Sequence, residues 1–198
     1  MQTEIEAKFP DVEPKSLRMI LSSVGAKLEH PECLMRRKNF DYPEHTLEAK
    51  GGWIRVRDEG DKVTLAYKQL NDRTLHGTKE VSLVVEDFGR MVQFLESVGF
   101  KQISYQETRR EKWLLKGVEV TIDTWPWVPT FVELEGPTEE SLKDVAKILN
   151  FDWENAMHGS VENIYQMHFD VTELEIDSWP EILFVEVPRD IEKKRIKR

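Results

Sequence analysis

The chain has 198 residues, of which 39% are hydrophobic and 33% charged, and its formal net charge is −9. This length suits one fairly large domain, or two small ones, with a proper core. The acidic balance argues against a general nucleic-acid-binding protein, and no apolar run is long enough to span a bilayer. We expect a cytoplasmic protein, because the single cysteine, Cys33, excludes an internal disulfide framework and no secretory signal is apparent.

Residues 3–9 alternate charged and apolar side chains with the period of a β-strand. Glu4, Glu6 and Lys8 share one face of this predicted strand, and the apolar side chains share the other. The two carboxylates would lie about 7 Å apart along the strand. Taken alone, the pattern fits either a solvated face or a chelating row that faces a confined space.

The remaining elements follow from periodicity and from turn residues. Helices with apolar stripes are predicted from Pro14 to Gly25, from Asp87 to Gly99, after Thr138 and after Ser160. Residues 193–198 form a basic end that we expect to be disordered. Further strands are predicted at 35–42, 53–57, 63–68, 79–85, 104–115, 118–124, 130–135 and 182–187.

The predicted strands each have one apolar face and one strongly charged face. Acidic residues on the charged faces are Glu4, Glu6, Glu80, Asp123, Glu133 and Glu135, and basic residues are Lys8, Arg36, Lys38, Arg55, Arg57, Lys68 and Arg110. Such faces would be solvated in an open antiparallel sheet, whereas closing the sheet would gather them in a shared interior. Interior carboxylates need divalent cations and interior arginines need an anion, and oxygen ligands favour Mg²⁺ or Mn²⁺. The closed alternative therefore favours a metal-chelated phosphate chain as ligand.

Six motifs, in order, carry a resemblance to a known family. They are Glu4-Ile5-Glu6-Ala7-Lys8, Arg55-Val56-Arg57, Leu65-Ala66-Tyr67-Lys68, Asp123, Phe131-Val132-Glu133-Leu134-Glu135, and Ser160 with Tyr165. This series resembles the CYTH domain proteins of the triphosphate tunnel metalloenzyme superfamily, which includes class IV adenylyl cyclases, thiamine triphosphatases and inorganic triphosphatases. The resemblance covers roughly residues 1–170.

The resemblance implies an α+β fold, an eight-stranded antiparallel closed β-barrel with helices packed outside. Residues 1–175 would form this tunnel domain, and residues 176–198 a C-terminal strand and basic tail. Implied catalytic residues are Glu4, Glu6, Lys8 and Lys68. Implied metal ligands are Glu4, Glu6, Asp123, Glu133 and Glu135, and the substrate-binding set is Lys8, Arg36, Arg55, Arg57, Lys68 and Arg110.

Two departures from the family pattern concern the site. Ser82 stands where a second acid is common, and Thr108 stands where the family has a lysine two residues before an arginine. We expect metal-dependent hydrolysis of tripolyphosphate or of an organic triphosphate such as thiamine triphosphate. Cyclisation of ATP to cyclic AMP and pyrophosphate is one alternative, and non-catalytic triphosphate binding is another. The expected partner is a small-molecule triphosphate, with no nucleic acid and no membrane, and a homodimer is left open.

Overall fold

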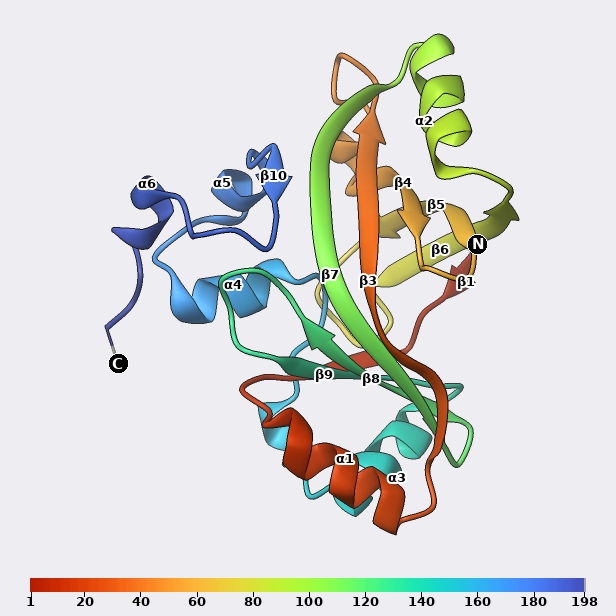
Figure 1. Ribbon diagram of the computed structural model, residues 1–198, viewed down its shortest axis with the longest axis vertical. Helices are drawn as coiled ribbons and strands as arrows, with labels where there is room; N and C mark the ends of the chain where they lie inside the picture. Colours follow the sequence, from red (N-terminus) through yellow and green to blue (C-terminus); the bar gives the residue numbers. More distant parts are fainter. Residues whose placement is uncertain (198) are drawn as a thin grey trace.

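The structure, a computed structural model, describes residues 1–197 and contains one continuous sheet with helices around it (Figure 1). The strands are β1 (Gln2–Thr3), β2 (Glu6–Phe9), β3 (Lys27–Asp41), β4 (Gly52–Asp58), β5 (Val63–Leu70), β6 (Thr78–Val85), β7 (Lys101–Leu115), β8 (Val118–Thr124), β9 (Phe131–Glu135) and β10 (Glu181–Ile182). The helices are α1 (Pro14–Ser23), α2 (Phe88–Ser97), α3 (Glu139–Ile148), α4 (Glu162–His168), α5 (Glu173–Asp177) and α6 (Arg189–Glu192), with 3₁₀ turns η1 (Glu48–Lys50) and η2 (Trp153–Asn155).

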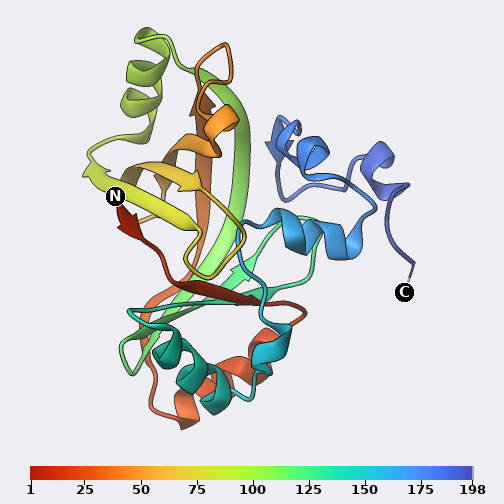
Figure 2. The ribbon, with the colours of Figure 1, turned by 180° about the vertical axis from the view of Figure 1, so that it is seen from behind.

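The sheet pairs in the order β1-β6-β5-β4-β3-β7-β8-β9-β2. Both ends of this order belong to the N-terminal segment, since β1 pairs with β6 and β2 pairs with β9. Between them, Glu4 N donates to Thr78 O and Ile5 O accepts from Gly136 N. The circuit of antiparallel pairs therefore returns to the segment where it began, and the sheet curls strongly (Figure 2). This confirms the predicted α+β fold with a barrel-like antiparallel sheet.

Helices cover the outer, apolar face of the sheet in two places. α1 and α3 pack under β2, β8 and β9, where Leu21 and Leu142 join Leu134 in one buried cluster (Figure 1). α2 covers the outer side of β3 and β4 through a cluster that includes Phe40 and Val56. Because the apolar side chains of β2, β4, β8 and β9 face these helices, the charged side chains of the same strands face inward.

The C-terminal segment packs beside the sheet and extends it by one short strand. β10 pairs in parallel with β7 at Tyr105 and Gln106. α4, α5, β10 and α6 share a third apolar cluster, which includes Tyr165, Ile176 and Ile182 (Figure 1). None of the helices within residues 1–197 is long and apolar enough to cross a membrane.

Three sequence predictions need correction. β3 begins at Lys27 rather than near Met35; its first half contains Pro31 and register shifts, and its β4 pairs begin only at Arg36. The strand predicted at 182–187 ends at Ile182. The basic end, expected to be disordered, contacts the rest of the protein: Arg195 pairs with Phe169 in an isolated bridge and stacks its guanidinium on that ring. Position 198 lies outside the described residues.

Candidate functional site

The inner face of the curled sheet lines a cavity of about 980 Å³. Most of the predicted site residues line it together: Glu4, Glu6, Lys8, Arg55, Arg57, Lys68, Arg110, Glu133 and Glu135. The charged faces of the strands therefore enclose a shared interior, which decides against the solvated-face alternative. Arg36 and Asp123 are not among the residues that line the cavity.

Lys8 stands between carboxylates at the junction of β2 and β9. Its Nζ lies 3.0 Å from Glu6 Oε1 and 3.0 Å from Glu133 Oε2, and it donates to Gly159 O at 2.6 Å. Burial disfavours the Lys8 charge, but Glu133 and Glu6 outweigh burial and raise its pKa. Burial also acts on Glu133, yet Lys8 and Arg110 hold the pKa of that carboxyl well below its usual range. The charges of Lys8, Glu6 and Glu133 therefore stabilise one another.

Lys68 forms a second lysine centre on β5. Its Nζ lies 2.9 Å from Glu4 Oε2 and 2.8 Å from Glu80 Oε2. Burial raises the pKa of Glu4, whereas Lys68 and Arg55 overcome burial and hold the pKa of Glu80 low. One lysine thus serves two carboxyl groups, and Glu4 is the one held less firmly in its ionised form.

Glu135 lies in an acidic environment. Burial raises its pKa to about 7, and the neighbouring charges that add to this are carboxylates: Glu133, Glu4, Glu6 and Glu119. Carboxylates gathered in a half-buried place favour either protons or a divalent cation. This donor set fits an oxygen-liganded metal such as Mg²⁺ or Mn²⁺.

Arginines dominate the other side of the cavity. Arg57 donates from Nε and Nη2 to Glu59 Oε1 at 3.0 and 2.7 Å, and Arg55 Nη2 lies 3.6 Å from Glu80 Oε2. Burial and the neighbouring Arg57 lower the pKa of Arg55 to about 10. Glu59 follows the last residue of β4. No local pattern shows that its side chain folds back onto Arg57.

Asp123, which the resemblance implies as a metal ligand, is bonded to Arg110 in this structure. It is fully buried, and Arg110 donates to its two oxygens from Nε and Nη2 at 2.6 and 2.8 Å. Oδ2 also accepts from the Thr121 hydroxyl at 2.7 Å. The carboxylate therefore stands behind Arg110, whose Nη2 also reaches Glu133 Oε1 at 3.2 Å. In this arrangement Asp123 orients Arg110.

The two consecutive arginines of β3 point in opposite directions. Arg37 pairs with Arg57 in register and lines the cavity, whereas Arg36 is exposed and lies 3.6 Å from Glu107 Oε1. The prediction placed Arg36 inside, which the register contradicts. The apolar side chain of Phe40 could have indicated this orientation. Phe40 is four residues after Arg36, so the two side chains share one face of β3, and Phe40 is buried beneath α2.

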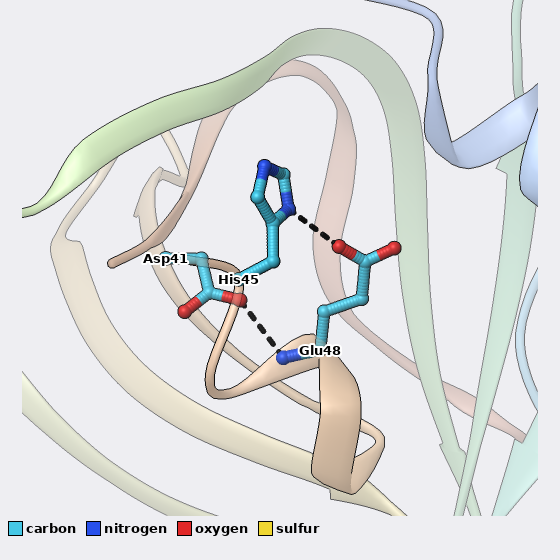
Figure 3. Close-up of side chains that lie close together, drawn as sticks. All are labelled: Asp41, His45 and Glu48. Carbon is cyan, nitrogen blue, oxygen red and sulfur yellow. Dashed lines mark hydrogen bonds and ion pairs between the residues drawn. The ribbon is translucent and has the colours of Figure 1, made fainter. Parts of the chain in front are cut away.

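A separate group of potential metal ligands is formed by Asp41, His45 and Glu48, whose ligand atoms all lie within 4.8 Å of one another (Figure 3). His45 Nδ1 lies 2.6 Å from Glu48 Oε2. Asp41, however, already accepts backbone N–H groups from Tyr42, Leu47 and Glu48, at 2.6, 3.0 and 2.8 Å. These bonds explain the buried carboxylate as the brace of the loop after β3. Within residues 1–197, no three tunnel carboxylates converge as closely.

Comparison with known proteins agrees with this geometry. A Methanocaldococcus jannaschii protein described as a candidate adenylate cyclase is 26% identical over 117 residues, which span 54% of this chain and 67% of that protein. The fold is similar to that of a candidate adenylate cyclase from Vibrio parahaemolyticus, with a TM-score of 0.72 and 15% identity over 83% of this chain and 98% of the other. It is also similar to a Hippeastrum candidate adenylyl cyclase described as having a dominant triphosphatase activity, with a TM-score of 0.56 and 14% identity over 88% and 94% of the two chains.

The sequence profile of the CYTH domain matches residues 2–174. This span contains every strand from β1 to β9, and therefore the acidic, lysine and arginine groups of the cavity described above. Motif order, fold and profile agree, and the chain belongs to the CYTH domain family.

Proposed function

We propose that the protein hydrolyses a terminal phosphoanhydride bond in triphosphate-containing small molecules, with Mg²⁺ or Mn²⁺ as cofactor. The observation that supports this most directly is the division of one cavity into a carboxylate-rich side on β2 and β9 and an arginine-rich side on β3, β4 and β7. A triphosphate carries about four negative charges near neutral pH, and it needs cations along its whole length. The cavity offers them.

Glu4, Glu6, Glu133 and Glu135 are the residues that would hold the metal. Mg²⁺ usually keeps several waters and takes one or two protein carboxylates together with substrate phosphates, so a preformed cage is not required. When bound, such an ion neutralises phosphate charge and lowers the pKa of an attacking oxygen. The raised pKa of Glu135 supports this assignment, because a nearby dication would relieve the carboxylate repulsion that adds to the effect of burial.

Lys8, Arg55, Arg57, Lys68 and Arg110 would bind the phosphates. Each already lies within 4.0 Å of a carboxylate oxygen, so phosphate oxygens would replace or supplement these contacts. Arginine suits this task because its planar fork can donate two parallel bonds to one phosphoryl group. Asp123, behind Arg110, would hold that fork in place.

Cyclisation of ATP is the competing reaction for the same site, with the ribose 3′-hydroxyl as the attacking oxygen instead of water. The candidate cyclases among the relatives support keeping it as the second function. Tripolyphosphate hydrolysis remains our first choice because it needs no base-binding pocket. A binding protein without turnover is the third, suggested by Ser82 and Thr108.

The test is to incubate the purified protein with tripolyphosphate, thiamine triphosphate or ATP, each with Mg²⁺ or Mn²⁺. Orthophosphate, pyrophosphate and cyclic AMP are then measured. We expect orthophosphate from tripolyphosphate, and its loss in a Glu4→Gln/Glu6→Gln variant but not in Glu140→Gln, which alters an exposed residue of α3. Cyclic AMP with stoichiometric pyrophosphate would favour the cyclase, and tight binding without any product would favour the binding protein.

A further inference from the structure

We propose that Arg37 binds a phosphoryl group of the substrate and forms, with Arg55 and Arg57, an anion subsite that works without metal. The inference rests on the proposed function for the kind of ligand, a polyphosphate, but concerns binding rather than turnover. It assigns a role to a residue that is absent from the substrate-binding set predicted from the sequence.

The position of Arg37 is fixed by its neighbours in the sheet. It pairs with Arg57 of β4 on one side and with Gln106 of β7 on the other. Its side chain lines the cavity, although the residue as a whole is only 7% exposed. Arg55 is equally buried and comes from the same inner face of β4. Three guanidinium groups therefore share one wall of the cavity.

Arg37 is distinguished from the other cavity cations by what it lacks. Among the lysines and arginines that line the cavity within residues 1–197, Arg37 alone has no carboxylate oxygen within 4.0 Å. Each of the other lining lysines and arginines has a glutamate or aspartate oxygen within that distance. Its Nη2 donates to Thr108 Oγ1 at 2.8 Å, and its Nε has no hydrogen-bond partner. Within the described chain Arg37 therefore forms no ion pair, and the carboxylate that favours its charge from farther away, Asp123, is already bonded to Arg110.

The surroundings make this arrangement costly in the absence of an anion. Burial lowers the pKa of Arg37 well below its usual range, and the nearby Arg57, Arg55 and Arg110 lower it further. An unpaired buried charge is among the least favourable features a fold can contain. A phosphoryl group beside Arg37 would supply the missing negative charge and accept from the free Nε, in the forked geometry that arginine favours.

The neighbouring strand explains why this cation stands on β3. Thr108 of β7 stands where the CYTH family pattern has a lysine, and its side chain bears no charge. The guanidinium of Arg37 donates a hydrogen bond to its hydroxyl. The subsite thus receives from β3 a positive charge that β7 does not provide. The indole of Trp125 lies under the guanidinium, with 4.7 Å between Cζ and the ring centroid, and would hold the fork in place.

The competing explanation is purely structural: Arg37 would be kept for its contacts with Trp125 and Thr108. The two explanations differ in the sign of a stability change. If the role of Arg37 is to bind an anion, replacing it with methionine removes a buried charge that has no ion pair. The replacement should then not lower the melting temperature of the ligand-free protein. If its contacts hold the fold together, the same replacement should lower that temperature.

The experiment compares wild type, Arg37→Met, Arg37→Lys and Arg36→Met, using tripolyphosphate as the probe and EDTA to remove metal. Arg36→Met is the matched control, since it removes the adjacent arginine from the outer face of the same strand. We expect Arg37→Met to melt at or above the wild-type temperature without ligand and to bind tripolyphosphate at least tenfold more weakly by calorimetry. Arg36→Met should bind with wild-type affinity.

The outcomes separate this proposal from the proposed function. Wild-type affinity in Arg37→Met, or no binding of tripolyphosphate by the wild type under EDTA, overturns the role of Arg37. If Arg37→Met melts far below wild type, the affinity of Arg37→Lys becomes the test. This variant keeps the positive charge but lacks the forked guanidinium, so it should bind tripolyphosphate at least threefold more weakly than wild type. Wild-type affinity in Arg37→Lys would overturn the proposal. Binding that depends on Arg37, in a protein that releases no orthophosphate when Mg²⁺ or Mn²⁺ is supplied, would support the subsite and count against the hydrolase.

Discussion

Glu6 and Glu135 face each other directly across β2 and β9, the pair of strands that completes the sheet circuit. Like charges at directly opposed positions destabilise an antiparallel pair. Lys8 lies 3.0 Å from Glu6 and relieves one member, but burial and the surrounding carboxylates raise the pKa of Glu135 to about 7. The fold thus brings together two carboxylates that repel each other at the place where a divalent cation is proposed.

A Glu135→Gln variant should therefore respond oppositely to EDTA and to Mg²⁺. Without metal at pH 8, we expect it to be more stable than wild type by about 1 kcal/mol, because a repulsive charge is gone. With excess Mg²⁺ that advantage should disappear, since the wild type gains more from the ion. Denaturant unfolding under both conditions measures this, with Glu140→Gln as control; a destabilised variant with an unchanged Mg²⁺ response would contradict it.

The pH dependence of the metal-free protein follows from the same carboxyl. Its pKa in the folded protein, about 7, is above the ordinary value of 4.5, so the folded state binds more protons between these values. The stability contributed by Glu135 is therefore fully present below pH 4.5 and is lost as pH rises through 7. After allowance for partial exposure, we expect a loss of about 2 kcal/mol between pH 5 and pH 8.

Melting temperatures measured in EDTA across that range test the slope. Mg²⁺ should flatten it, because the ion competes with the proton for the same oxygens. Glu135→Gln should reduce it as well, without metal, and leave the part that comes from Glu4, Glu162 and Asp177, whose pKa values burial also raises. A wild-type protein that becomes more stable between pH 5 and pH 8 in EDTA would show that this carboxyl does not control the dependence.

Asp123→Asn tests whether this residue orients Arg110 or binds metal. The change breaks the pair between the fully buried Asp123 and the partly buried Arg110, with distances of 2.6 and 2.8 Å, and we expect a loss of about 3 kcal/mol in unfolding free energy. Thr121→Val removes one hydrogen bond to the same carboxylate and should cost about 1 kcal/mol. Tripolyphosphate affinity should fall in Asp123→Asn while the Mg²⁺-induced stabilisation persists. Loss of that Mg²⁺ response would instead restore Asp123 to the set of metal ligands.

The alternation of charge predicts most of the inner surface because β2, β4 and β9 each have an unambiguous apolar face. The alternation does not predict the inner face of β3, where Arg36, Arg37 and Lys38 follow one another. Because both faces of this strand are charged, charge alone cannot show which face lines the cavity. Register decides there, through the pairing of Arg37 with Arg57 and the burial of Phe40 under α2. A single-strand pattern lacks this information, because register is a property of two strands.

Contacts between distant segments are the other part that sequence could not provide. Asp123 has the spacing of a ligand, but its two bonds to Arg110 depend on the pairing of β7 with β8. Likewise, the basic end was expected to be disordered because of its charge. The ring of Phe169 beneath Arg195 gives that end a packing partner, which local composition cannot reveal.

The part of the cavity lining around Arg73 provides the last prediction. Arg73 lies in the loop between β5 and β6, donates to Asn163 Oδ1 at 2.7 Å and lies 2.7 Å from Glu173 of α5. Around it, the lining also contains Glu162 and Asp177, and burial together with neighbouring carboxylates raises the pKa of each. We call Glu162, Glu173 and Asp177 the acidic rim, which would repel an incoming polyanion. The positive charge of Arg73 offsets part of this negative charge.

Arg73→Met should raise KM for tripolyphosphate several-fold with little change in kcat, because it makes the rim more negative without touching the reacting groups. Added salt should shrink the effect by screening these partly exposed charges. Glu173→Gln breaks the same ion pair from its acidic side and supplies the matched control. If the charge of the rim controls substrate binding, the two variants change KM in opposite directions. If the ion pair only holds α5 against the loop, both variants raise KM alike at every salt concentration.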